Sequence, residues 1–102
     1  MKHLVLIIHA GLKQSTADEL RKLEIVDEFT FTNIEGHGVQ SEGLANLSDR
    51  DKVVGYIPQL RVDIILEDSK VESVLAIFNT GENLEHKQNM FWVTNIESMG
   101  RF

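Results

Sequence analysis

A strand, a helix and a second strand can be traced twice along this chain of 102 residues, and few folds have that order. In the first half, the apolar and β-branched run from Leu4 to Ile8 predicts a strand buried on both faces. Aromatic and β-branched residues alternate from Phe29 to Ile34, which predicts a strand with two different faces. Between these strands, Thr16 and Glu19 have the spacing of a capping box, so we expect a helix from about Thr16 to Glu24.

The second half repeats the same order. Apolar and polar residues alternate from Leu60 to Leu66, which predicts a third strand with Pro58 just ahead of it. Ser69 and Glu72 again have capping-box spacing, and the apolar residues that follow them at helical intervals predict a second amphipathic helix. The segment from Met90 to Ile96 is rich in aromatic and β-branched residues and predicts the fourth strand.

This order predicts an α+β fold of the ferredoxin-like type, βαββαβ, with a four-stranded antiparallel sheet and two helices on one face. The first and third strands, which are the most apolar, are expected at its centre. The other face of the sheet would carry Arg61 and Asp63 among apolar neighbours, as an ion pair or a subunit contact. Such a face fits a second subunit better than water, so we predict a closed homo-oligomer.

Composition bounds the class of protein. The length and the 42% hydrophobic and 25% charged content fit one globular domain, residues 1–102, with no disordered bias. No apolar run is long enough for a membrane span, and the first residues are a poor signal peptide, so we expect a cytoplasmic protein without membrane insertion. A net charge of −6 argues against nucleic-acid binding, and the lack of cysteine excludes disulfides and thiolate ligands.

Three of the four histidines are expected at one end of the predicted sheet. His9 follows the first strand, His37 follows the second, and His86 lies in the loop before the fourth, whereas His3 falls at the opposite end. Several carboxylates accompany them: Glu35, Glu42, Glu82 and Glu85. Imidazoles and carboxylates together can hold a divalent transition metal, although histidines at loop ends are also often simply exposed.

The tripeptide Gly36-His37-Gly38 has two interpretations. Its glycines either let backbone N–H groups face an anion or only allow the chain to bend. No nucleophilic arrangement of serine, histidine and aspartate stands out, so we predict that the protein is not an enzyme. A competing hypothesis is a small isomerase or monooxygenase, classes that ferredoxin-like oligomers include, with His9 or His37 as a base in an apolar pocket.

A long polar connection separates the two halves, although compact domains usually join strands with two to six residues. Together with the order of elements, the run IEGHGVQ, followed by seventeen residues and then by PQLRVDIILEDSKVESVLAIFNTG, resembles the PII signal-transduction proteins. The resemblance covers essentially the whole chain, and the spacing from Gln40 to Pro58 equals that of the family. It identifies approximately residues 37–57 as similar to the PII T-loop.

The resemblance implies a homotrimer that senses a small effector in clefts between subunits and signals through the T-loop to a transporter or enzyme. A loop whose conformations differ in effector affinity is a sufficient switch. The ligand-binding residues that it implies, at the T-loop base and the inter-subunit cleft, are Gly36, His37, Gly38, Gln40, Thr80, Gly81, Lys87 and Arg101.

The chain also departs from the PII pattern. The phosphate-contacting arginine of the family is Val39 here, the lysine after the proline is Gln59, and the modified tyrosine and serine are Lys52 and Arg50. The standard ATP contacts are therefore largely absent, which leaves a nucleotide or a divalent metal as alternative ligands. The chain is similar to the PII-like group associated with heavy-metal efflux systems, which implies an efflux pump as partner. The alternative is a heavy-metal-binding protein with a CutA-like tolerance role that uses His9, His37 and His86.

Overall fold

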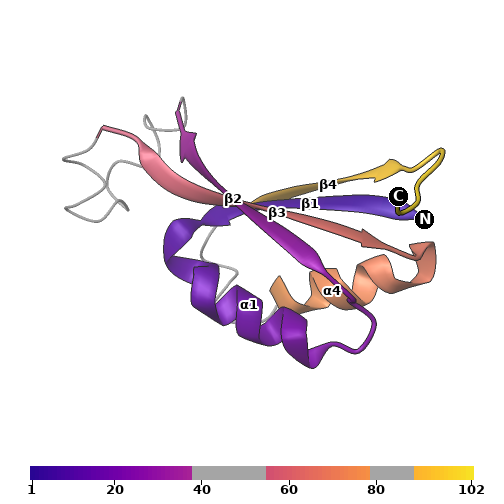
Figure 1. The fold of residues 1–102 in the computed structure, drawn as a ribbon. Helices are drawn as coiled ribbons and strands as arrows, with labels where there is room; N and C mark the ends of the chain where they lie inside the picture. Colours follow the sequence, from indigo (N-terminus) through magenta and orange to yellow (C-terminus); the bar gives the residue numbers. More distant parts are fainter. Residues whose placement is uncertain (38–54, 79–88) are drawn as a thin grey trace.

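The computed structural model describes residues 1–37, 55–78 and 89–102 of the chain. Within these ranges four strands and two α-helices follow the order βαββαβ (Figure 1). The elements are β1 (Lys2–His9), α1 (Lys13–Lys22), β2 (Phe29–Gly36), β3 (Ile57–Leu66), α4 (Val71–Phe78) and β4 (Met90–Asn95). Short 3-10 turns, η1 (Ala10–Leu12) and η3 (Asp68–Lys70), precede the two helices. The predicted ferredoxin-like fold is confirmed.

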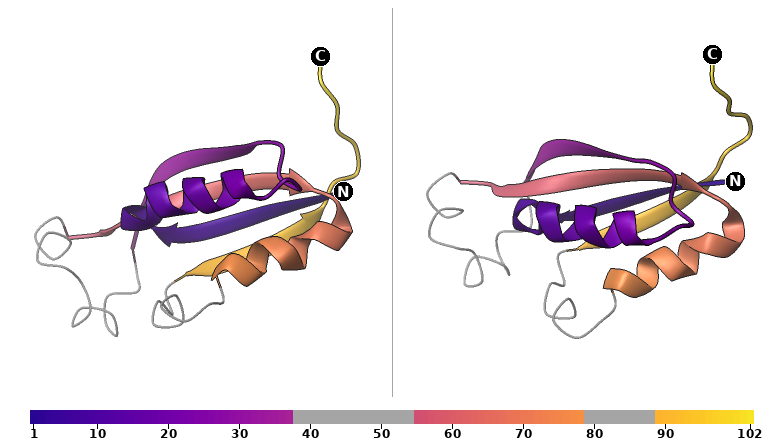
Figure 2. Two further views of the ribbon diagram at one scale, coloured as in Figure 1. Left: turned by 90° about the horizontal axis from the view of Figure 1, so that it is seen from below. Right: turned by 60° about the horizontal axis from the view of Figure 1, so that its bottom comes forward.

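The four strands form one antiparallel sheet in the order β2-β3-β1-β4. β1 and β3 are central, as their apolar sequences predict, and they pair in register from Lys2 opposite Leu66 to His9 opposite Gln59. β2 and β4 are the two edges. Both helices lie on the same face of the sheet (Figures 1 and 2).

The hydrophobic core lies between this face and the helices. The side chains of β3 that the period-two pattern assigns to one face are all buried there, and they meet Leu20 of α1 and Val74 of α4. Alternate residues of β1 complete the layer. The fully or almost fully buried members of the cluster are Leu4, Leu6, Ile8, Leu20, Leu60, Val62, Ile64, Leu66 and Val74.

The start of the first helix differs from the prediction. Thr16 does not cap it but is buried inside α1, three residues after the helix begins at Lys13. The chain turns first through η1, where the His9 side chain accepts a hydrogen bond from the backbone N–H of Gly11. The spacing of Thr16 and Glu19 is therefore coincidental, and a histidine, not a threonine, acts at the turn where the chain enters the helix. In the second half, Ser69 likewise lies inside η3, one turn ahead of α4.

β3 begins at Ile57, earlier than predicted, so Pro58 lies inside the strand and not ahead of it. On the side of β2, Pro58 is opposite Glu35, whereas pairing with β1 starts only at Gln59. A proline cannot donate a hydrogen bond, so it fits at a position that has a partner strand on one side only.

Neither of the two described helices lies over the second face of the sheet, and we call it the open face. It consists of the alternate residues Thr30, Thr32, Ile34 and Gly36 of β2, Ile57, Gln59, Arg61, Asp63 and Ile65 of β3, His3, Val5, Ile7 and His9 of β1, and Met90, Trp92 and Thr94 of β4. Large apolar side chains are exposed on it at Ile65, Met90 and Trp92. This is the arrangement that the prediction of a subunit contact requires.

Candidate functional site

The carboxyl ends of β1 and β2 and the start of β3 meet at one end of the sheet. Gln59 of β3 is flanked by His9 on one side and Ile34 on the other, and Gly36 pairs with Ile57. His3 lies near the opposite end, opposite Ile65. The register thus places His9 and the strand that leads to His37 at the end where the topology predicts them, with residues 38–54 between β2 and β3.

Gly36 is buried because the Gln59 side chain lies over it. A Cβ atom at Gly36 would come within 2.4 Å of the Gln59 side-chain oxygen and within 2.7 Å of its Cδ. The glycine therefore makes room for a side chain of the neighbouring strand, which neither of the two interpretations of the Gly-His-Gly tripeptide anticipates. Gly55, at the other end of the connection, has a positive φ of 77°, a conformation that glycine adopts readily.

His37 lies just beyond β2 and is largely exposed. Its Nε2 is 3.1 Å from Glu35 Oε1, and its ring centroid is 5.9 Å from that of Tyr56, the residue before β3. A polar contact between two exposed side chains such as these contributes little to stability. The contacts nevertheless bring together the two chain segments that enter and leave the connection.

The predicted metal site finds no support in the part of the chain that the structure describes, where no group of three or more His, Asp or Glu side chains could hold a metal ion. His9 uses Nδ1, at 2.9 Å, to accept the hydrogen bond of Gly11, and His37 pairs with Glu35. The third predicted ligand, His86, lies outside the described residues.

Arg101 lies at the other end of the protomer. The C-terminal segment runs from β4 across the sheet end that holds the N-terminus (Figure 2), and there Arg101 binds the carboxylate of Glu28, just before β2. Within one protomer the structure therefore does not bring Arg101 together with Gly36 and His37. The other predicted ligand-binding residues lie outside the described ranges: Gly38, Gln40, Thr80, Gly81 and Lys87.

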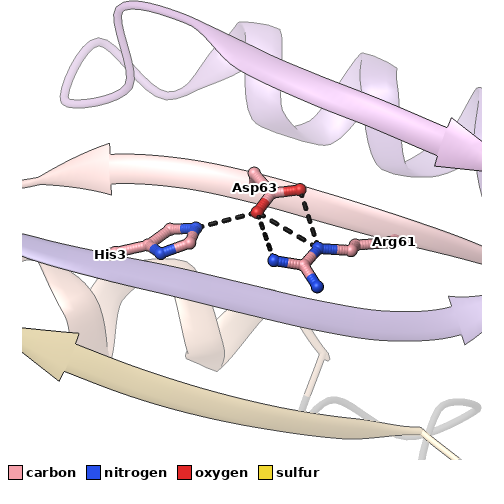
Figure 3. Close-up of polar contacts among 3 residues, drawn as sticks. All are labelled: His3, Arg61 and Asp63. Carbon is pink, nitrogen blue, oxygen red and sulfur yellow. Dashed lines mark hydrogen bonds and ion pairs between the residues drawn. The ribbon is translucent and has the colours of Figure 1, made fainter.

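The sequence predicts only the Arg61–Asp63 pair of a larger polar cluster on the open face, and Figure 3 shows this pair together with His3. Asp63 accepts hydrogen bonds from Arg61 Nε and Nη2 at 3.1 and 3.0 Å, and His3 Nε2 lies 2.8 Å from Asp63 Oδ1. Arg61 also places its guanidinium carbon 5.7 Å from the ring centroid of Trp92. We call these four residues the open-face cluster.

Hydrogen bonding sets the charges of this cluster. The bonds from Arg61 hold the pKa of the Asp63 carboxyl below its ordinary value, with the bond from His3 acting in the same direction and partial burial opposing both. The same bonds raise the pKa of Arg61. The alternation along β3 correctly predicts the Arg61–Asp63 pair, whereas the role of His3 depends on its diagonal position across the strand register.

Solved structures share this fold. A protein of the DUF3240 family from Shewanella baltica OS155 has a TM-score of 0.73 at 21% identity, covering 99% of this chain and 94% of the other. CPII, a nitrogen regulatory PII-like protein from Thiomonas intermedia K12 bound to ADP, AMP and bicarbonate, has a TM-score of 0.68 at 17% identity, covering 99% and 94%. A putative PII-like signaling protein from Thermus thermophilus has a TM-score of 0.63 at 17% identity, covering 93% and 84%.

These structures define the class of fold: the chain folds as PII-like signalling proteins do, as the sequence resemblance implies. The model of the family described as "Protein of unknown function (DUF3240)" matches residues 1–102, so the chain belongs to that family. No curated protein matches the sequence. No helix in the described ranges is long and apolar enough to cross a membrane.

Proposed function

We propose that this protein is a PII-like regulator without enzymatic activity. It assembles as a homotrimer in the cytoplasm, senses a small effector in the clefts between subunits, and signals through the T-loop, approximately residues 37–57, to a transporter or enzyme. A heavy-metal efflux pump is the proposed partner. The observation that carries this proposal is the PII-like sheet with an open face and with a long connection leaving from the end of its β2–β3 pair.

Two features of the structure support the T-loop assignment. Gly36 and Ile57 are paired, and His37 and Tyr56 approach each other, so the chain enters and leaves the connection at one point of the sheet edge. The base of the connection therefore lies where the resemblance to the PII family puts the base of the T-loop. In a protein that signals through such a loop, a ligand acts by favouring the state that it contacts better.

The ligand-binding residues of this proposal are those at the T-loop base and the cleft: Gly36, His37, Gly38, Gln40, Thr80, Gly81, Lys87 and Arg101. Since Arg101 lies at the far end of its own protomer from Gly36 and His37, it would bind the ligand in a cleft formed with a neighbouring subunit. Because Val39 and Gln59 replace basic residues of the PII pattern, a ligand with fewer phosphates than ATP is favoured.

The test is a thermal-shift screen with ADP, AMP, ATP, 2-oxoglutarate and bicarbonate, followed by sedimentation of the unliganded protein. A ligand at a hundred times its Kd stabilises the native state by about 2.7 kcal/mol, which for a domain of this size is roughly a 10 °C rise in Tm. We expect at least one ligand of the panel to produce such a rise. Copper, zinc, nickel and cobalt, each added alone, test the metal-binding alternative.

A pair of variants locates the binding. His37→Ala removes a side chain at the T-loop base, and Glu72→Ala removes an exposed side chain on α4 as a matched control. The ligand-induced shift should fall in the first variant and persist in the second. A protein that is monomeric at micromolar concentration, or that responds to none of these ligands, would contradict the proposal.

A further inference from the structure

The open face is almost free of charge, unlike the rest of the molecule. A quarter of the residues in the chain are charged, yet on this face the described strands carry formal charges only at Arg61 and Asp63, which neutralise each other. Depletion of charge together with exposed aromatic and aliphatic side chains distinguishes the centre of a protein interface from ordinary surface. The composition of the face therefore favours contact with an equally uncharged surface, such as the same face of a second copy.

The cluster at the middle of this face is already formed in the single protomer. β1 lies between β3 and β4, so Arg61 must extend across β1 to place its guanidinium group 5.7 Å from the Trp92 ring. Val5, which is flanked in register by Asp63 and Trp92, is fully buried although neither described helix lies on its side of the sheet. A preformed arrangement loses little side-chain entropy when a second surface covers it.

His3 is the member of this cluster that can gain a charge by taking up a proton. From β3 it faces Asp63 and Arg61, and from β4 it faces only the uncharged Thr94 and Trp92. The two charges that precede His3 in the chain, the Met1 amino group and Lys2, pair with Asp68. Since the bonds from Arg61 keep the pKa of Asp63 low, Asp63 stays ionised at mildly acidic pH.

We propose that the open-face cluster is the polar centre of the contact between copies of this chain, and that protonation of His3 weakens the assembly. This inference rests on the proposed function, since it adds a regulation to its trimer. With His3 neutral, the cluster has no net charge and can be covered at moderate cost. With His3 protonated, Asp63 is shared between two cations, Arg61 and His3, so the cluster keeps one net positive charge per subunit that must be desolvated.

Sedimentation velocity over a concentration series at pH 7.5 and at pH 5.5 tests the inference. We expect the concentration at which wild-type protein dissociates to be roughly tenfold or more higher at pH 5.5, because a proton taken up by His3 leaves the covered cluster with a net charge. His3→Gln keeps a donor that can reach Asp63 but cannot become charged, so its assembly should be the same at both pH values. Lys2→Gln, one residue away on the opposite face, is the matched control and should respond to pH as wild type does.

His3→Lys carries a permanent charge and should be dissociated already at pH 7.5. Circular dichroism at each pH confirms that the dissociated protomers remain folded. If wild type assembles equally well at both pH values, or if His3→Gln loses assembly at pH 5.5 as wild type does, the inference is overturned while the proposed function stands. A wild-type monomer at pH 7.5 would instead overturn the trimer itself.

Discussion

The substitution Ile65→Lys tests whether the open face of the sheet is covered by another subunit or faces water. Ile65 is 45% exposed in the protomer and lies on the open face, opposite His3. If this face is in solvent, the lysine remains hydrated, and the substitution changes the free energy of unfolding by no more than about 0.5 kcal/mol. If the protein is a monomer, Ile65→Lys should therefore leave the stability almost unchanged.

If a second copy covers the face, the outcome is different. Each subunit then buries a lysine beside Asp63, the carboxylate of the open face, which is already bound by Arg61. A buried polar or charged group without a partner costs at least about 2 kcal/mol, which corresponds to about a thirtyfold weaker contact per subunit. The Ile65→Lys variant should thus be monomeric at concentrations where wild type is assembled.

Size-exclusion chromatography with light scattering measures the difference. Ala76→Lys, on an exposed position of α4, adds the same side chain on the helical side and should leave the assembly intact. Circular dichroism must show that both variants are folded. An Ile65→Lys variant with the mass of the wild-type assembly would refute the idea that the open face is the contact.

Three further predictions concern single residues. Gly36→Ala should cost about 1 kcal/mol in urea unfolding, because its Cβ displaces the Gln59 side chain, and a second change, Gln59→Ala, should restore most of that loss; no recovery would show that the strain is in the backbone. Asp63→Asn should make the stability less dependent on acid pH. Because the folded-state pKa of Asp63 is lowered, the stability that this carboxylate contributes is present above its unfolded pKa of about 3.9 and is lost as the pH falls through the folded pKa. Acid unfolding measured in this range should therefore show a loss of stability in wild type that the variant does not show. Leu20→Ala, in the fully buried contact of α1 with the sheet, should cost about 2–5 kcal/mol, and a loss below about 1 kcal/mol would mean that the helix does not pack there in solution.

The sequence predicts the sheet well because the burial of a strand determines which of its positions are apolar. The period-two alternation in β3 assigns each residue from Leu60 to Leu66 to the face that it occupies, and the continuous apolar run in β1 marks a central strand. The order of elements then selects the fold. The first residue of a helix is harder to predict, since the capping-box spacing also occurs by chance, as the buried Thr16 shows.

Side-chain partnerships across strands are harder to predict because they depend on register. A shift of a single residue would put His3 on the helical face and separate it from Asp63. His9 could not be recognised as the group that accepts the Gly11 N–H, because histidine is not among the residues that usually cap helices. Likewise, Gly36 is explained by Gln59, a residue far along the chain that only the β2–β3 pairing brings close.

β3 connects the two regions to which we assign a function. Gln59, which covers Gly36 at the base of the connection, and Arg61, which belongs to the open-face cluster, are alternate residues on the same face of one strand. Side chains two residues apart along a strand are separated by about 7 Å, so they are close neighbours. A ligand that displaces Gln59 would therefore act beside the proposed subunit contact, and assembly would in turn restrict Gln59. If both proposals hold, effector binding and trimer stability are coupled, and each strengthens or weakens the other by the same factor.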